Sequence, residues 1–183
     1  MALRLTLVCH AATRAQKSAR FPADDPVAFD GPLPAVLQAI GTGKRARFMH
    51  APEARARQTA ERLSAQSQCV SALRDLDFGR WRGLSIDGVA TAEPEALQAW
   101  LTEWDAAPHG GETLAQLSGR VEQWLGKLAG EGHIVAVTHP SVMRMALMHA
   151  LRCPPQAFHT IDIGPLSTLD LRFNGVWRLR LQP

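Results

Sequence analysis

The sequence has little of several features that mark specialised classes of protein. Among its 183 residues there is no tyrosine, aromatic residues make up only 6%, and there are three cysteines. Cys9, Cys69 and Cys153 are widely spaced and form no Cys-x-x-Cys pair, which excludes a disulfide scaffold and favours a reducing compartment, by default the cytoplasm. The chain opens on strand-like alternation instead of a basic and apolar leader, so we expect no signal peptide.

Long apolar runs and a strong charge imbalance are also missing. The most apolar stretch, residues 134–151, contains His139, Pro140 and Arg144 and therefore cannot cross a bilayer. Twenty Lys and Arg residues oppose 17 Asp and Glu residues, without a basic run that could follow a nucleic-acid backbone. We expect neither a membrane nor a nucleic-acid partner. With 46% hydrophobic residues and no internal repeat or linker, residues 1–183 are predicted to form one globular domain.

Strand-like and helix-like patterns alternate along the chain, and a long loop is expected over residues 11–34. The predicted strands are residues 3–8, 46–50, 69–73, 133–138, 168–173 and 176–181. The predicted helices are residues 33–40, 52–65, 94–103, 114–129 and 140–151. Asn174-Gly175 between the last two strands is a strong hairpin signal. The whole pattern predicts a three-layer α/β/α sandwich with a mostly parallel central sheet and a C-terminal antiparallel hairpin.

Two strand-to-helix junctions share one design. Residues 49–52 and 137–140 each place a proline in the first turn of the following helix. Free backbone N–H groups and the positive end of each helix dipole should then face the carboxyl edge of the sheet and attract an anion. His139 lies at one junction, Arg55 falls in the first turn of the other helix, and His10 ends the first strand. We therefore predict that these three side chains converge on one pocket.

Two imidazoles and a guanidinium are suited to a phosphate group. A guanidinium binds a phosphomonoester dianion through paired hydrogen bonds, and an imidazole near its unperturbed pKa can attack as a neutral nucleophile. The plainer alternative is that His10 and His139 are simply hydrogen-bonded histidines at strand ends. The spacing alone does not separate these two interpretations.

The order of short motifs along nearly the whole chain resembles the histidine phosphatase superfamily, which is also called phosphoglycerate mutase-like. The most specific match is Ala51-Pro52-Glu53-Ala54-Arg55-Ala56-Arg57-Gln58-Thr59-Ala60, which is similar to the family's Ser-Pro-x-x-Arg-Ala-x-Gln-Thr-Ala signature. The other matching segments are Leu7 to Thr13, Arg20-Phe21, Leu73 to Gly83, Gly110 to Thr113, Arg120-Val121 and Val137 to His139.

The resemblance implies a role for each matching residue. His10 would be the nucleophile, Arg55 the phosphate clamp, and His139 a second imidazole that stabilises the transferred phosphoryl group. The family's acid is usually a glutamate, and Asp75 occupies its place. Because aspartate reaches less far than glutamate, Asp77 remains a rival for protonating the leaving oxygen.

Thr13 and Arg20 complete the implied phosphate site. The implied activity is hydrolysis of a small phosphorylated metabolite through a phosphohistidine intermediate, with no metal and no cofactor. A phosphatase is favoured over a mutase, since the chain is short and only residues 84–108 are available to close over a bisphosphate.

The first motif departs from the family, because Cys9 stands where the family has arginine and Ala11 where it has glycine. Losing a charged donor of this kind typically costs about 10²–10³ in rate. Six other cations could take its place: Arg14, Lys17, Arg20, Arg57, Arg80 and Arg82. The alternative function is a phosphate-binding or anion-binding protein that keeps the pocket and has weak or no turnover.

Cys9 itself has three interpretations. It could be a small buried residue at the end of a strand, or a thiolate whose pKa nearby cations lower. It could also join His10 and His139 as a zinc ligand, although no compact ligand motif supports this.

Overall fold

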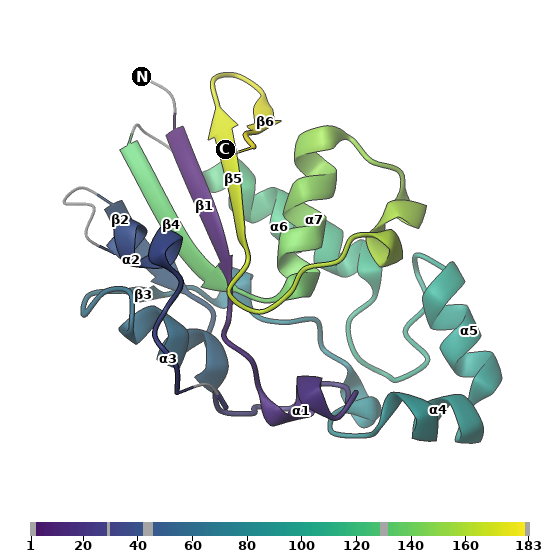
Figure 1. Cartoon of the computed structure of the whole chain (residues 1–183). Coiled ribbons are helices and arrows are strands. Elements are labelled where there is room, and N and C mark those ends of the chain that lie inside the picture. Colours follow the sequence, from purple (N-terminus) through teal and green to yellow (C-terminus); the bar gives the residue numbers. More distant parts are fainter. Residues whose placement is uncertain (1–2, 29, 42–45, 129–131, 182–183) are drawn as a thin grey trace.

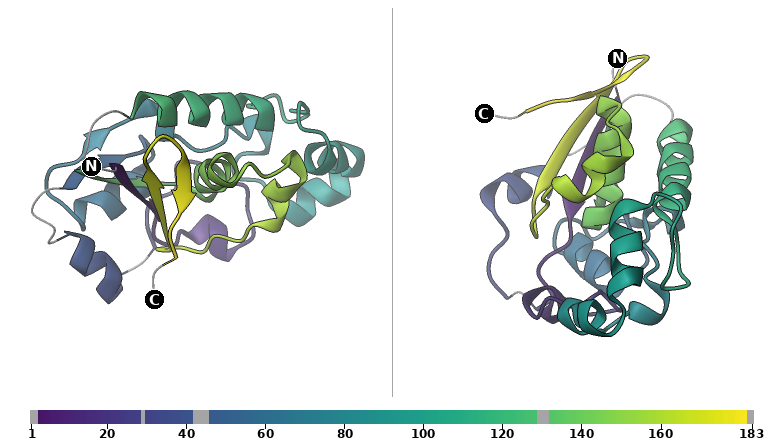
Figure 2. Two further views of the ribbon diagram at one scale, coloured as in Figure 1. Left: turned by 90° about the horizontal axis from the view of Figure 1, so that it is seen from above. Right: turned by 90° about the vertical axis from the view of Figure 1, so that its right-hand side faces the viewer.

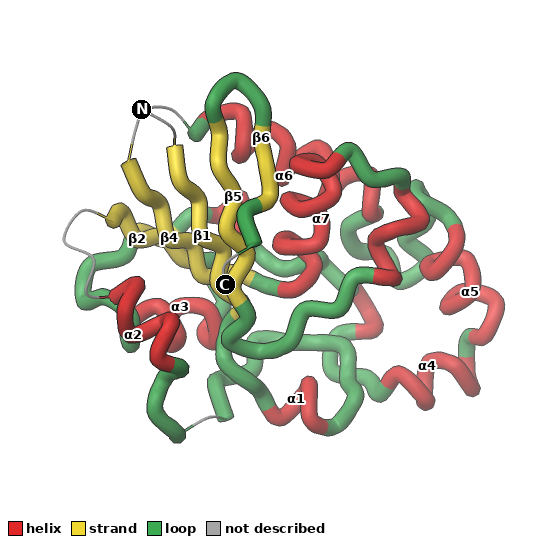
Figure 3. Tube along the Cα trace, turned by 45° about the horizontal axis from the view of Figure 1, so that its top comes forward, coloured by secondary structure: helices red, strands yellow, loops and turns green. Residues whose placement is uncertain are grey.

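All the named strands belong to one central sheet. The computed structural model describes residues 3–28, 30–41, 46–128 and 132–181. Six strands lie in the order β3-β2-β4-β1-β5-β6 (Figures 1 and 3). They are β1 (Leu3–Cys9), β2 (Ala46–His50), β3 (Gln68–Cys69), β4 (Gly132–Thr138), β5 (Thr168–Phe173) and β6 (Trp177–Leu179). The first four are parallel, and β5 and β6 are antiparallel, which confirms the predicted fold class.

Helices cover both faces of the sheet. The α-helices are α1 (Arg14–Lys17), α2 (Ala35–Gly41), α3 (Ala54–Glu61), α4 (Ile86–Ala92), α5 (Pro94–Thr102), α6 (Leu114–Lys127) and α7 (Pro140–Leu151). Three short 3₁₀-helices are η1 (Ser71–Leu73), η2 (Gly79–Trp81) and η3 (Pro155–Thr160). Helices α6 and α7 lie on one face and α2 on the other (Figure 2). This is the layering that right-handed crossovers between parallel strands produce.

Several elements differ from the sequence prediction, and one of them is α1, which forms within the loop expected over residues 11–34. Strand β3 has only two residues at the edge of the sheet, and the rest of the predicted strand over residues 69–73 turns into η1. Helix α3 begins at Ala54 and ends at Glu61, which makes it shorter at both ends than predicted. Helix α4 was not predicted, because Gly88 and Thr91 are weak helix formers and Val89 is its one buried side chain.

The register of the central strands positions the site. Strand β1 pairs with β4 so that Cys9 lies opposite Thr138, and β2 pairs with β4 so that His50 lies opposite Val137. The amide of His10 donates to the carbonyl of Thr138 at 3.0 Å, which extends the β1–β4 pairing beyond the strand. Both central strands are buried along most of their length. The residues that follow β1, β2 and β4 therefore meet at one edge of the sheet.

Candidate active site

His10 lies at this edge as a neutral imidazole. Its Nδ1 is 2.8 Å from the carbonyl oxygen of Ala11, and because a carbonyl can only accept, Nδ1 carries the ring proton. Burial, together with the nearby His139, lowers the pKa of His10 from its ordinary value to about 4. Among the described residues Nε2 has no hydrogen-bond partner, so its lone pair is free to attack.

Arg55 is buried in the first turn of α3. Each of its three guanidinium nitrogens donates a hydrogen bond. Its Nη2 donates to Oδ2 of Asp75 at 2.7 Å, its Nη1 to the carbonyl of Ala23 at 2.6 Å, and its Nε to Nδ1 of His139 at 3.2 Å. The Thr59 hydroxyl donates to the carbonyl of Arg55 and accepts from the amide of Ala11, which ties α3 to the end of β1.

Asp75 is held as a carboxylate by several donors. Its Oδ1 accepts from the Ser141 hydroxyl at 2.6 Å and from the amide of Leu76 at 2.8 Å, while Oδ2 faces Arg55. Burial would raise the pKa of this carboxyl, but His139, Arg55 and Ser141 together outweigh burial and hold the pKa well below its usual range. Asp75 is therefore ionised near neutral pH in the ligand-free site.

His139 caps α7 just before Pro140 and lies fully buried behind His10, with 5.2 Å between the two ring centroids. Nδ1 of His139 lies 3.2 Å from Nε of Arg55 and 3.4 Å from Oδ2 of Asp75, and Nε2 donates to Oε2 of Glu53 at 2.8 Å. The other oxygen of Glu53 accepts from the amide of Asp75 at 3.0 Å. Both ring nitrogens of His139 are thus engaged, and the residue contacts the guanidinium of Arg55.

A cavity of about 280 Å³ opens beside His10. Its polar lining includes Thr13, Arg55, Asp75, Ser141 and Arg144, and its apolar lining includes Pro22, Phe78, Pro140 and Ile163. His10 and Arg55 line this cavity, and the buried His139 packs against both of them, so the structure brings the three predicted side chains together. Asp75 and Thr13, which the family resemblance implied, line the cavity as well. Thr13 also caps α1, since its hydroxyl accepts from the amide of Gln16.

Three predicted residues do not line this cavity, and one of them, His139, is buried behind His10. Arg20 is exposed and donates to the carbonyl of Gly83, so the structure does not bring it to His10. Asp77 is also exposed and accepts from the amide of Gly79, and between the two acids only Asp75 lines the cavity with His10. None of the six cations named as substitutes for the missing arginine lines it. Local sequence pattern could not show which loop side chains turn inward.

The two departures at the first motif have different consequences. Ala11 is buried with an ordinary negative φ, and its amide bonds to Thr59, so its methyl group strains nothing. Cys9 is also fully buried, and burial raises the pKa of its thiol to about 12. The structure therefore favours the small buried thiol over the thiolate. Over the described ranges of the chain no group of three histidine, cysteine or acidic side chains is placed to hold a metal ion.

Glu53, Ser141 and Arg144 belong to the site but were not predicted. Glu53 precedes α3, and its only sequence signal was an acidic side chain at the start of a helix. Ser141 and Arg144 follow His139 by two and five residues, and helical spacing from Pro140 could have indicated that they share one face of α7.

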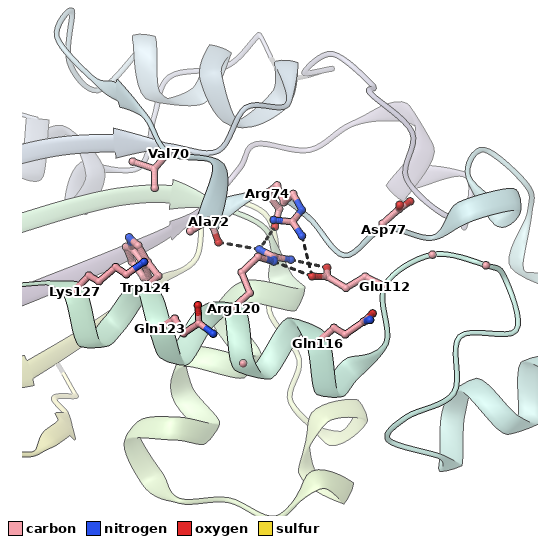
Figure 4. Close-up of a pocket in the computed structure, with 13 residues that line it drawn as sticks. Val70, Ala72, Arg74, Asp77, Glu112, Gln116, Arg120, Gln123, Trp124 and Lys127 are labelled. Carbon is pink, nitrogen blue, oxygen red and sulfur yellow. Dashed lines mark hydrogen bonds and ion pairs between the residues drawn. The ribbon is translucent and has the colours of Figure 1, made fainter.

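A larger cavity, of about 950 Å³, lies beside α6 (Figure 4). Its lining includes Arg120 and Glu112 but none of His10, Arg55 and His139. Arg120 donates to Glu112 through two nitrogens, at 2.8 and 2.6 Å, and to the carbonyls of Ala72 and Arg74. The donors of Arg120 are therefore used to hold the segment that leads to Asp75.

No helix in the described ranges is long and apolar enough to cross a membrane.

Comparison with curated proteins identifies two kinds of relative. The adenosylcobalamin/alpha-ribazole phosphatase of Escherichia coli K12 is 26% identical over 110 residues, which are 57% of this chain and 54% of that protein. The bifunctional protein Rv2228c of Mycobacterium tuberculosis is 28% identical over 114 residues, which are 60% of this chain and 31% of that protein. The matched residues thus span 31% of one of these relatives and 54% of the other.

Solved structures match over almost the whole chain. The alpha-ribazole phosphatase from Shigella flexneri superposes with a TM-score of 0.81 at 21% identity, covering 97% of this chain and 95% of that one. A mutant phosphoserine phosphatase from Entamoeba histolytica, in complex with phosphoserine, gives 0.82 at 18% identity, covering 97% and 94%. These likenesses establish the shared fold.

The family assignment rests on a match of greater extent. The model of the histidine phosphatase superfamily (branch 1) matches residues 5–181, which include every residue of the site described above. The chain therefore belongs to the histidine phosphatase superfamily (branch 1).

Proposed function

We propose that this protein is a phosphohydrolase that cleaves a small phosphomonoester through a phosphohistidine at His10. The observation that carries the proposal is the state of His10: a neutral ring whose Nδ1–H is fixed on Ala11 and whose free Nε2 borders a cavity with Arg55 and Asp75. Its relatives include phosphatases of several small phosphorylated molecules, which supports the same class of reaction.

In the first step Nε2 of His10 attacks phosphorus, and the bond from phosphorus to the ester oxygen breaks. The proton on Asp75 passes to the leaving oxygen. In the second step water attacks the phosphohistidine, its proton returns to Asp75, and the P–N bond breaks to release phosphate and neutral His10. Thr13 would donate a hydrogen bond to a phosphoryl oxygen, since its hydroxyl lines the cavity.

Arg55 and Asp75 must exchange partners when substrate binds. In the free site His139, Arg55 and Ser141 keep Asp75 ionised, and an ionised carboxyl cannot protonate a leaving group. A phosphate dianion would compete for Arg55 and add negative charge, and both effects raise the pKa of Asp75. His139, held by Glu53, would position Arg55 during this exchange.

The same observations leave one rival function, a phosphate-binding protein without appreciable turnover. Cys9 in the place of the family's arginine and the ionised state of Asp75 favour it.

We also propose that residues 1–183 form one domain. We propose further that the protein resides in the cytoplasm, since all three cysteines are free thiols.

Hydrolysis of 4-nitrophenyl phosphate by the wild-type protein and by His10→Ala tests the proposal. We expect release of nitrophenolate by the wild type, an acid-labile phosphate on the peptide that contains His10, and loss of both in the variant. Phosphate binding by a wild-type protein that never turns over would establish the rival function instead.

A further inference from the structure

The cavity beside His10 is short of positive charge for a phosphate dianion. Position 9, where the family has an arginine, holds a neutral thiol whose pKa burial raises to about 12. The guanidinium of Arg55 is already paired with the carboxylate of Asp75, so these two charges offset one another. A dianion that enters this cavity therefore needs a second cation nearby.

Arg144 lines the same cavity and has a guanidinium available for a ligand. Its Nε donates to the carbonyl of Ile161 at 2.6 Å, and its guanidinium carbon lies 5.6 Å from the ring centroid of Phe158. These two contacts hold the planar group in place. Within the described ranges its two terminal amino groups have no hydrogen-bond acceptor, and no carboxylate lies within ion-pair distance.

The position of Arg144 on α7 directs it toward the site. Side chains of a helix lean toward its N-terminus, and Arg144 stands one turn after Ser141, whose hydroxyl also lines the cavity. The first turn of α7 adds backbone N–H groups and the positive end of the helix dipole. Arg144 interacts electrostatically with Asp162, Asp75 and Cys9, in decreasing order. It lines the same cavity as His10, the residue that directly follows Cys9, and this places it near the position that the missing arginine would serve.

We propose that Arg144 is the phosphate-binding cation of this protein and replaces the arginine missing at position 9. Its two terminal amino groups bind two oxygens of the phosphoryl group as a fork, while Arg55 remains within reach of Asp75 and His139. The inference rests on the proposed function for its effect on turnover, but the binding of phosphate by Arg144 does not require turnover.

Calorimetric titration with inorganic phosphate tests this assignment directly. We compare the wild type with Arg144→Gln, with Arg144→Lys, and with Arg57→Gln, which removes the same charge from the exposed face of α3. We expect Arg144→Gln to raise the dissociation constant of phosphate at least about 10-fold and to lower kcat/KM for 4-nitrophenyl phosphate about 10²–10³-fold. Arg57→Gln should change neither by more than about 2-fold.

Arg144→Lys keeps the charge but loses the planar fork. We expect it to fold and to raise the phosphate dissociation constant by a smaller factor than Arg144→Gln. Circular dichroism and thermal unfolding check each variant, and if Arg144→Gln does not fold, wild-type phosphate affinity in Arg144→Lys overturns the proposal. Wild-type affinity and kcat/KM in a folded Arg144→Gln overturn it equally.

The outcomes separate the two proposals. A wild type without turnover, whose phosphate binding is lost in Arg144→Gln, removes the proposed hydrolase function and retains the assignment of Arg144. A turning-over wild type whose kinetics and phosphate affinity do not change in Arg144→Gln removes the assignment of Arg144 and retains the hydrolase.

Discussion

The proposed mechanism requires two opposite protonation states of Asp75, because Asp75 pairs with Arg55 as a carboxylate in the free site and, as the proposed acid, would carry a proton in the substrate complex. Only the substrate-bound state can satisfy the second demand. The pH dependence of kcat reports the substrate-bound form and that of kcat/KM the free form, so the apparent pKa of the acid should be higher in kcat.

Asp75→Asn should remove the alkaline limb of the kcat profile and lower turnover of alkyl phosphates far more than that of 4-nitrophenyl phosphate, since nitrophenolate leaves without a proton. Asp77→Asn is the matched control, because Asp77 bonds the amide of Gly79 outside the cavity. Steady-state rates on both substrate types across the acidic and neutral pH range provide the measurement. An unaffected Asp75→Asn beside an impaired Asp77→Asn would show that the acid is misassigned.

Replacing Cys9 with arginine tests whether the site still lacks a positive charge. A charged donor aimed at a phosphoryl group is worth a few kcal/mol, so an unfilled position would give Cys9→Arg a gain of about 10-fold or more in kcat/KM. With Arg144 in the cavity we expect less than about 3-fold. Cys9→Ser, which changes the side chain without adding charge, is the control for disturbance of the buried strand end.

At the scale of elements, α6 stabilises the loop that carries Asp75. Arg120 and Glu112 are both largely buried, and Arg120 also donates to the carbonyls of Ala72 and Arg74 (Figure 4). Breaking a buried ion pair typically costs about 3–5 kcal/mol when the remaining charge is left uncompensated, but Glu112 keeps a second partner in the more exposed Arg74, at 3.1 Å.

Arg120→Gln should therefore lower the free energy of unfolding by about 2 kcal/mol, less than the loss of the whole ion pair would cost, because Arg74 still neutralises Glu112. It should also reduce turnover, because the backbone before Asp75 loses its support. Urea denaturation measures the first effect. Arg57→Gln, which breaks an exposed pair with Glu61, should cost no more than about 0.5 kcal/mol, and equal losses in the two variants would contradict this account of Arg120.

The glycines of the neighbouring loops show a second element-level constraint. Gly79 has a φ of +47°, and a Cβ at this position would lie 2.2 Å from the carbonyl oxygen of His109. The backbone of η2 thus packs directly against the loop that precedes Glu112. A side chain at Gly79 would separate the two loops that flank Asp75.

At the scale of the whole molecule, several histidines are held neutral by the fold. The pKa of His10 is lowered to about 4, and burial also lowers the pKa values of His50, His109, His133 and His159. In the unfolded chain these rings bind protons near pH 6.5, so between their two pKa values the unfolded state holds more protons. The lowered pKa values of Asp75 and Glu53 act in the same direction at lower pH.

The free energy of unfolding should therefore be greatest above about pH 6.5 and fall steadily as the pH approaches 4. His10 alone contributes on the order of 3 kcal/mol to this loss. Urea denaturation at about pH 7 and about pH 4.5 measures the change, and His10→Gln should show a smaller difference between the two pH values. Stability that rises on acidification would contradict the assignment of neutral rings.

The sequence by itself determined the succession of most strands and helices along the chain. It also determined which three residues, His10, Arg55 and His139, meet at the carboxyl ends of the parallel strands. Hydrophobic alternation defines β1 and β4, proline and glycine mark the ends of elements, and parallel strands must bring their carboxyl ends together. His10, Arg55 and His139 follow from these local rules. The short β3 and the helix α4 did not, because their apolar patterns are too weak to show burial.

Only the tertiary structure decided which side chains complete the site. Arg20 donates to the carbonyl of Gly83, and Asp77 accepts from the amide of Gly79, so both lie outside the cavity beside His10. Arg144, which is far from His10 in the sequence, lines that cavity from α7. Which loop residues point inward depends on contacts between segments far apart in the chain. The protonation states of His10 and Asp75 depend on burial and on charges from several such segments, and neither is a property of local sequence.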